Sequence, residues 1–362
     1  MSLKIERKKF DRRLLAGLIL PVLALVPAIA LTGGHAETAQ TERKPAPATR
    51  TGMKIPRLVT PPQTITDPTQ PLPPPQQQRP FIFGMGAELD PAIDERLVAE
   101  APVKMLSSWY NGPNDLNFMR GWKNGTVADA YARGYKLHLI VYNNGTEQNL
   151  STKYGAACGR AYPLSVGFLN DMKELATIFN GSGELYVSMF TELQTYPCQD
   201  NNWVGSENYY RALQDQYRSA MAIFRQYAPN SKMSLSFGGW VANWDDPAKF
   251  GGKSLLLKFA DVMNESDFQS FQAMATQGDN KELILRTTEA LKPYGPVMIS
   301  HYKPDNASQT SWNTDIDAIF TDDNITTLQN HGVFAFSFMD ADLIRDEAAY
   351  QKVKAAVTKY AR

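Results

Sequence analysis

The regular alternation of short apolar runs with stretches of helical character most constrains the fold of this chain. Eight such runs lie between Phe81 and the end of the chain, at residues 81–90, 103–112, 136–145, 184–196, 232–240, 268–274, 296–304 and 332–342. Strands that alternate with helices favour a parallel sheet, because a parallel crossover needs a dozen or more residues. Eight strand–helix units predict an α/β fold, a closed (β/α)8 barrel, whose active site would lie at the carboxyl ends of the strands. Most of the eight runs become polar and aromatic at that end.

The stretches between the runs carry apolar residues at helical spacing. In the clearest one, which spans Ser206 to Ala228, Ser206 can cap the start and Pro229 follows the end. The other predicted helices are Leu164–Phe179, Ser254–Met263, Glu282–Leu291, Ile316–Asn330 and Glu347–Tyr360.

The first 36 residues resemble an export segment. A basic stretch (Lys4 to Arg13) precedes an apolar run from Leu14 to Leu31 and the small residues Gly34-His35-Ala36. We interpret residues 1–36 as a cleaved signal peptide, with a retained membrane anchor as the alternative. Either interpretation predicts a secreted or extracellular protein, tethered to the membrane only through this segment if it is retained.

Residues 37–80 form a Pro-rich linker, since they hold eleven of the 23 prolines and few large apolar residues. Such a segment buries too little apolar surface to offset its ordering entropy, so we expect a semi-extended spacer. The barrel would then occupy residues 81–362. From residue 80 onward the chain carries 25 basic and 32 acidic residues. This acidic balance argues against a nucleic-acid partner, whose phosphates attract Lys and Arg.

Strand phase predicts which residues face into the barrel, because alternate side chains point to opposite sides. In the run at residues 184–196, Leu185, Val187 and Met189 should pack on helices. Tyr186, Ser188, Phe190 and Glu192 should face inward.

Glu192 is the strongest catalytic candidate. A carboxyl group at the end of a barrel strand, rimmed by aromatic side chains, suits general acid catalysis on a sugar linkage, because an apolar rim raises its pKa. The alternative role is structural, with the carboxylate accepting hydrogen bonds from backbone N–H groups of a loop.

Glycoside hydrolysis ordinarily needs a second carboxylate. Glu88 has the inward phase at the first strand, and Asp340 ends the eighth but shares its phase with Phe334, Phe336 and Phe338. Asp245-Asp246 follow the fifth strand, where Asp-Asp-Pro also reads as a turn. We expect Glu88 or Asp340 to be the partner.

Aromatic residues gather at the predicted strand ends. Aromatic faces stack on the C–H faces of sugar rings, while hydroxyls and ring nitrogens reach hydrogen bonds. The predicted substrate-binding residues, which include one strand histidine, are Trp109, Tyr142, Tyr196, Trp240, Trp244, His301 and Tyr302.

Two cysteines, Cys158 and Cys198, follow the third and fourth strands, and an exported protein usually pairs such cysteines. We therefore predict a disulfide between two loops at one face of the barrel. The sequence has no HExxH motif and no His-x-His pair on the first strand, so no metal or organic cofactor is implied.

The strand ends SMFTELQTY and FSFMDAD, together with the aromatic rim, resemble the glycoside-hydrolase TIM-barrel superfamily over residues 81–362. The resemblance implies a general acid role for Glu192. It departs from the clan with two catalytic glutamates, which usually has Asn before the acid and a Glu after strand seven. Here Thr191 precedes Glu192, and strand seven ends in Ser300-His301-Tyr302.

Three functions are consistent with these patterns. The first is an exported, monomeric glycoside hydrolase that cleaves an oligo- or polysaccharide. The second is a non-catalytic glycan-binding barrel at the cell surface, which would need the aromatic rim but no catalytic pair. The third, another metal-free hydrolase, is less favoured because the sequence lacks a G-x-S-x-G motif and its cysteines are predicted to pair.

Overall fold

The computed structural model describes residues 81–86, 88–93, 95–142, 145–198, 207–244, 254–274, 280–303, 309–339 and 346–361. The predicted export segment (1–36) and linker (37–80) lie outside these residues, so both remain predictions. Within the described part, none of the helices is long and apolar enough to span a membrane.

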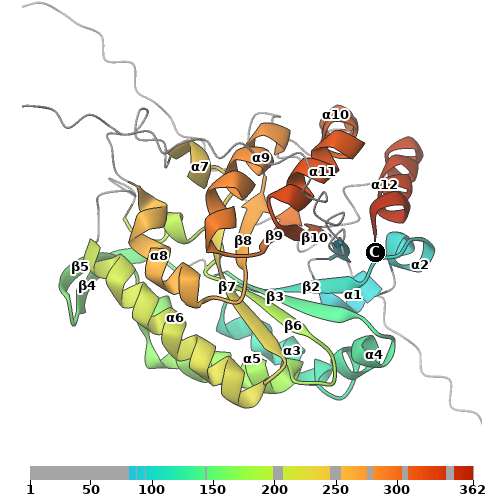
Figure 1. Ribbon diagram of the computed structural model, residues 1–362. Helices are drawn as coiled ribbons and strands as arrows, with labels where there is room; N and C mark the ends of the chain where they lie inside the picture. The colour runs from blue at the N-terminus through green and yellow to red at the C-terminus, as the bar shows by residue number, and fades with distance from the viewer. Residues whose placement is uncertain are drawn as a thin grey trace, which may run out of the picture. The chain divides into compact units, whose positions relative to one another are not determined.

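Eight of the described strands form a closed, parallel barrel, which confirms the predicted fold (Figure 1). Each predicted apolar run contains one strand: β1 (Ile82–Met85), β2 (Met105–Tyr110), β3 (Lys136–Val141), β6 (Leu185–Met189), β7 (Ser231–Gly238), β8 (Gln269–Ala273), β9 (Val297–Tyr302) and β10 (Val333–Phe338). The order around the barrel is β1-β10-β9-β8-β7-β6-β3-β2. Gly84 of β1 pairs with Ser337 on one side and with Met105 on the other, which closes the ring.

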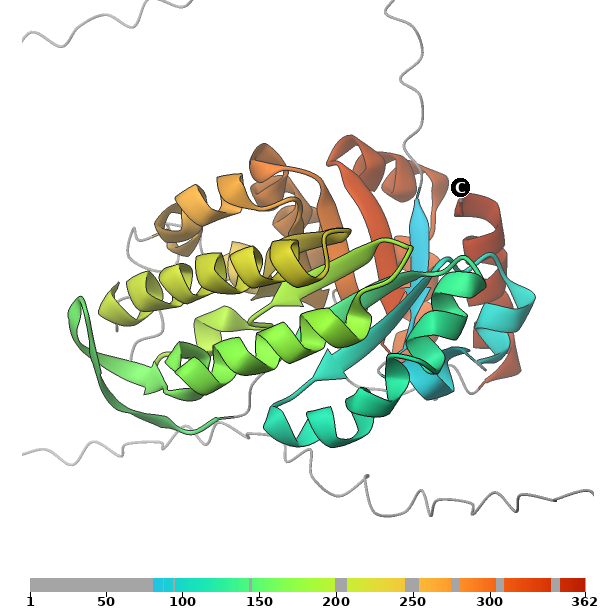
Figure 2. The same ribbon diagram turned by 90° about the horizontal axis from the view of Figure 1, so that it is seen from below.

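The connecting segments form helices outside the strands. They are α1 (Leu89–Ile93), α2 (Arg96–Glu100), α3 (Leu116–Met119), α4 (Thr126–Ala132), α5 (Val166–Phe179), α6 (Glu207–Tyr227), α7 (Val241–Trp244), α8 (Leu255–Glu265), α9 (Asn280–Leu291), α10 (Gln309–Ile319), α11 (Asp322–Asn330) and α12 (Glu347–Tyr360). The long helices α5 and α6 lie side by side along the outside of the barrel (Figure 2). Ser165 caps α5, accepting a hydrogen bond from Phe168 N at 3.0 Å, and Ser254 caps α8 in the same way.

The core has two parts. The larger lies between the strands and the helices, and it holds Leu185, Val187 and Met189, as strand phase predicts. The smaller fills the barrel interior near the amino ends of the strands and consists of Ile82, Met105, Tyr186, Phe268, Met298 and Ala335, with Phe334 packed against it. Apolar packing inside the barrel thus excludes a pore.

Two predictions of local structure are wrong. The stretch Ile316–Asn330 is two helices, because Thr321 accepts a hydrogen bond from Asn324 N and starts α11 after α10 has ended. Phe334 does not share the phase of Phe336 and Phe338: it packs against Tyr186, since the β10–β9 register shifts between Val333 and Ala335.

A hairpin absent from the sequence-based prediction follows β3. Strands β4 (Glu147–Thr152) and β5 (Gly155–Arg160) pair antiparallel in a sheet of their own, beside one end of α6 (Figure 1). The segment is polar and rich in Gly and Ala, so it lacks the β-branched and aromatic residues that mark strands.

Gly86, directly after β1, should not tolerate a side chain. Its φ is +113°, and an added Cβ would lie 2.4 Å from the Cβ of Ala92. We expect Gly86→Ala to lower the free energy of unfolding by at least about 2 kcal/mol, because backbone strain adds to a steric clash. Gly121→Ala is the control, since an added Cβ there meets nothing within 4 Å. Equal urea midpoints for the two variants would contradict the interpretation.

Candidate functional site

The chain changes direction twice between β6 and η5 (Leu193–Thr195). Phe190 and Glu192 both have φ near +59°, in the left-handed region that costs a non-glycine residue roughly 1–3 kcal/mol. The first turn sends Phe190 outward, where its ring stacks on Phe168 of α5 at 5.4 Å. The predicted inward orientation of Phe190 is therefore wrong, because the strand ends at Met189. The second turn brings Glu192 back over the barrel.

Glu192 is partly buried, and its carboxylate accepts a hydrogen bond from the side-chain amide of Gln272, which lies on β8. Burial raises the pKa of Glu192, while the bond from Gln272 and the charges of Arg160 and Lys303 act in the opposite direction. The net pKa lies above the ordinary glutamate value. A carboxyl group in this state can hold a proton at higher pH than a solvated one and then donate it.

Aromatic rings lie on one side of the barrel mouth, by which we mean the end of the barrel where Glu192 lies. The ring centroid of Trp109, on β2, is 6.0 Å from that of Tyr142 and 4.5 Å from that of His301 on β9. The guanidinium carbon of Arg160 lies 5.8 Å from the centre of the Tyr142 ring. Burial raises the pKa of Tyr142, and the charge of Glu192 raises it further, which places these side chains in one electrostatic environment.

Below the mouth, the barrel interior holds a buried polar group centred on His138. His138 on β3 contacts Ser188 through Nε2 at 2.8 Å and Ser107 through Nδ1 at 3.1 Å, and Ser107 contacts Ser337 at 2.8 Å. Burial lowers the pKa of His138 to about 3, so its imidazole is neutral. His138 is thus a core residue whose two ring nitrogens both have partners.

An irregularity in β9 decides how His301 and Tyr302 point. Between β9 and both of its neighbours the register shifts by one residue, so Phe271 pairs with Ile299 while Gln272 pairs with His301. The extra residue turns His301 toward Trp109 and turns Tyr302 outward. Tyr302 is fully buried against Phe336 and donates to Asp315 at 3.0 Å. The prediction of Tyr302 as a substrate-binding residue is therefore not supported by its position.

Of the other predicted site residues, the structure describes Tyr196, Trp240 and Glu88. Tyr196 is fully buried beneath Arg160, whose guanidinium carbon is 4.6 Å from the ring centre, and it is not part of an open rim. Trp240 is partly buried, with its ring folded over Gly238 at the end of β7. Glu88 is exposed, directly before α1. Asp340 lies outside the described residues, as do Asp245-Asp246 and the side chain of Trp244.

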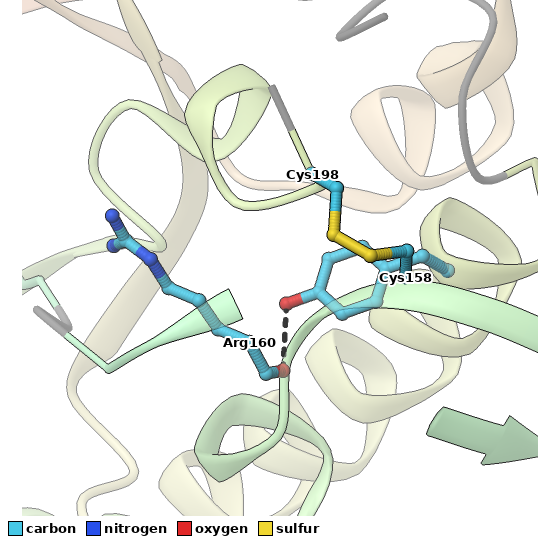
Figure 3. The surroundings of a disulfide bond; sticks show 4 residues. Cys158, Arg160 and Cys198 are labelled. Atoms are coloured by element: carbon cyan, nitrogen blue, oxygen red, sulfur yellow. Dashed lines mark hydrogen bonds between the residues drawn. A yellow bond between two sulfur atoms is a disulfide. The ribbon is translucent and has the colours of Figure 1, made fainter. Parts of the chain in front are cut away.

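The predicted disulfide joins Cys158 of β5 to Cys198, with a Cα–Cα distance of 5.5 Å (Figure 3). Gly159 forms a bridge with Pro197, and Arg160 N donates to Tyr196 O at 3.2 Å. Tyr209 of α6 donates to the backbone oxygen of Arg160 at 3.0 Å, as the dashed line in Figure 3 shows. The hairpin is thus attached to the segment that follows Glu192, and the Arg160 side chain points away from the disulfide.

Sequence reasoning missed three residues around Glu192: Gln272, Arg160 and Lys303. Strand phase could have identified Gln272, since Phe271 and Ala273 on either side pack outward. No strand pattern marks Arg160, because its hairpin lacks the β-branched and aromatic residues typical of strands. Across the described ranges, no three His, Cys, Asp or Glu side chains come together in a way that could hold a metal ion.

No family model and no curated protein sequence matches the chain. Among solved structures, a psychrophilic glycoside hydrolase family 10 endo-β-1,4-xylanase aligns with a TM-score of 0.50 and 12% identity, over 76% of this chain and 96% of that one. A GH5_18 protein from Streptomyces cattleya aligns with a TM-score of 0.49 and 13% identity, over 78% of this chain and 81% of that one.

The exo-β-1,4-mannosidase Op5Man5 from an Opitutaceae bacterium aligns with a TM-score of 0.48 and 9% identity over 72% of this chain. The present chain spans about half (51%) of the length of that mannosidase. These neighbours are glycoside hydrolases. At such identities the likeness concerns the fold: this chain has a closed (β/α)8 barrel, the fold it shares with the xylanase.

Loss of the disulfide should destabilise the protein. Replacing Cys158 and Cys198 by Ser should lower the free energy of unfolding by roughly 2–5 kcal/mol, because the unfolded chain gains freedom. Thiol titration of the denatured, non-reduced parent checks the pairing itself, and two reactive thiols per chain would contradict it.

The raised pKa of Glu192 should also be visible in stability. Folding favours the protonated form of Glu192, so the stability that this group contributes is fully present below the unfolded pKa and is lost as pH rises through the folded pKa. Glu192→Gln should therefore gain stability relative to the parent over this range, by about 1.4 kcal/mol for each tenfold difference in proton affinity.

Urea unfolding of both proteins at a series of pH values measures this difference. Glu265→Gln is a control of opposite sign, because the hydrogen bond from Arg218 lowers the pKa of Glu265. That variant should lose stability relative to the parent as pH rises. A stability difference between Glu192→Gln and the parent that does not change with pH would refute the raised pKa.

Proposed function

We propose that this protein is a glycoside hydrolase, exported from the cell, in which Glu192 is the general acid. The observation that carries the proposal is a partly buried carboxyl group at the barrel mouth, with a raised pKa and the rings of Trp109 and Tyr142 beside it. General acid catalysis on a glycosidic bond needs a group that is protonated near the working pH and next to a surface on which a sugar ring can stack. The substrate would be an oligo- or polysaccharide.

The second carboxylate in this proposal is Glu88 or Asp340, in that order. Glu88 follows β1, and β1 and β6 are three strands apart around the barrel; Asp340 follows β10, which lies opposite β6. Separations across a barrel suit the gap of about 6.5–9.5 Å that leaves room for an attacking water better than the gap of about 5–5.5 Å of a nucleophile. We therefore propose an inverting reaction.

A non-catalytic glycan-binding protein is the second candidate, and one observation favours it. The side chain that contacts the carboxylate of Glu192 within the described residues is the amide of Gln272, which can neither attack a sugar carbon as a carboxylate does nor accept a proton from water. This candidate keeps the aromatic rings and needs no catalytic pair.

Glu192→Gln should reduce kcat by about 10²–10⁴-fold on any polysaccharide that the parent cleaves, since Gln keeps the shape but has no proton to donate. Binding of the corresponding oligosaccharide, measured by calorimetry, should survive. The matched control is Glu174→Gln, a half-exposed residue of α5 paired with Arg120, which should leave kcat unchanged. Full activity of Glu192→Gln would disprove its role as the acid.

Glu88→Gln and Asp340→Asn separate the two candidate partners, because only the variant that lacks the true base should lose kcat to a similar extent. The anomer released first, followed by NMR, should be the inverted one. A broad polysaccharide panel that shows binding without cleavage by the parent would replace the hydrolase by the glycan-binding protein.

A further inference from the structure

Three of the side chains near Glu192 carry buried polar atoms that have no hydrogen-bond partner within the described part of the chain. They are Nε1 of Trp109, Oε1 of Gln272, and both ring nitrogens of His301. Folded proteins satisfy most of their buried polar groups, so several unsatisfied atoms in one place call for an explanation such as a ligand or ordered water. The nearby imidazole of His138, by contrast, has partners on both nitrogens.

The three side chains lie on three different strands but form one group. The rings of Trp109 and His301 are 4.5 Å apart, and Gln272 is paired in register with His301. The Nε2 of Gln272 donates to the carboxylate of Glu192, so its Oε1 is the atom left over. Trp109 and Glu192 are partly exposed, whereas His301 is closed off from solvent. A ligand would therefore reach the group past Trp109 and Glu192.

The available hydrogen-bonding atoms differ in kind. The indole of Trp109 only donates, the free oxygen of Gln272 only accepts, and a neutral imidazole does both. Burial lowers the pKa of His301 well below its usual value, so the imidazole is neutral. Each hydroxyl of a sugar both donates and accepts, so adjacent hydroxyls match this set. A carboxylate only accepts and would leave Oε1 of Gln272 facing another oxygen, while an ammonium group only donates and would oppose the indole N–H.

We infer that Trp109, Gln272 and His301 form a binding site for adjacent hydroxyls of an uncharged sugar ring, placed next to Glu192. The inference rests on the proposed function and adds a substrate class: neutral saccharides, in preference to uronic acids. Acidic sugars are the physical competitor, because the positive charges of Arg160 and Lys303 act on the same mouth.

The test measures binding in the Glu192→Gln background, so that no probe is cleaved. Calorimetry with xylotetraose, mannotetraose, cellotetraose and tetragalacturonate should find at least one neutral probe bound about 10-fold or more tightly than tetragalacturonate. His301→Phe keeps the ring beside Trp109 and removes both nitrogens; it should weaken the best neutral probe by about 10-fold, the effect expected for one or two lost hydrogen bonds.

Matched variants separate binding from folding. Trp109→Phe should weaken the same probe, whereas Trp122→Phe, which removes an indole N–H bonded to Asp90 elsewhere, should not. His301→Gln restores a donor and an acceptor and should recover part of the affinity. Without a ligand, His301→Phe should raise the Tm, because it removes unsatisfied buried groups; a purely structural histidine would give a lower Tm. Trp109→Phe carries the test if His301→Phe does not fold.

The outcomes distinguish the inference from the proposed function. Tight binding of a neutral probe that His301→Phe and Trp109→Phe leave unchanged would overturn the inference alone and assign the unsatisfied atoms to ordered water. Tighter binding of tetragalacturonate would also overturn it, while the carbohydrate-binding function stood. Binding of none of the four probes, together with no cleavage of any polysaccharide, would overturn both.

Discussion

Closure of the barrel is the constraint on which the other features depend. Once β1 pairs with both β2 and β10, every inward side chain must pack against side chains of other strands, because the ring has no edge. In the part of the interior near the amino ends of the strands, apolar packing around Tyr186 meets this demand. Above it, His138 and the serines of neighbouring strands satisfy one another. Next to Glu192, polar atoms of Trp109, Gln272 and His301 have no partner among the described residues, so the chemistry of the interior changes along the barrel axis.

Two departures from regular strand geometry form the mouth. After β6, left-handed residues at Phe190 and Glu192 first turn a ring outward and then bring a carboxyl group over the barrel. In β9, one extra residue brings His301 beside Trp109. Conformations of this kind persist only where the surrounding packing holds them, and they occur often at functional sites. Both lie at the carboxyl ends of strands, where barrels of this fold carry their active sites.

Sequence periodicity predicted the parts of the fold that obey it. The alternation of strands and helices gave the barrel, and strand phase placed Leu185, Val187 and Met189 on the outside. It failed at Phe190, because a positive φ turns a side chain to the other face without leaving a mark on the pattern, and the extra residue of β9 that turns Tyr302 outward leaves none either. Gln272 was within reach of the same reasoning, but as a neutral amide it does not resemble a catalytic group. Arg160 could not be identified from strand phase, since only the tertiary position of its hairpin brings it to Glu192.

The disulfide has a consequence for how damage to the chain would spread. Cys158 and Cys198 are 40 residues apart, and the covalent loop between them contains α5, β6 and Glu192. A single proteolytic cut anywhere inside that loop would leave both fragments linked, since each carries one of the two cysteines. In an oxidising environment rich in proteases, the segment that carries Glu192 would thus remain attached to the barrel after a break in its own backbone.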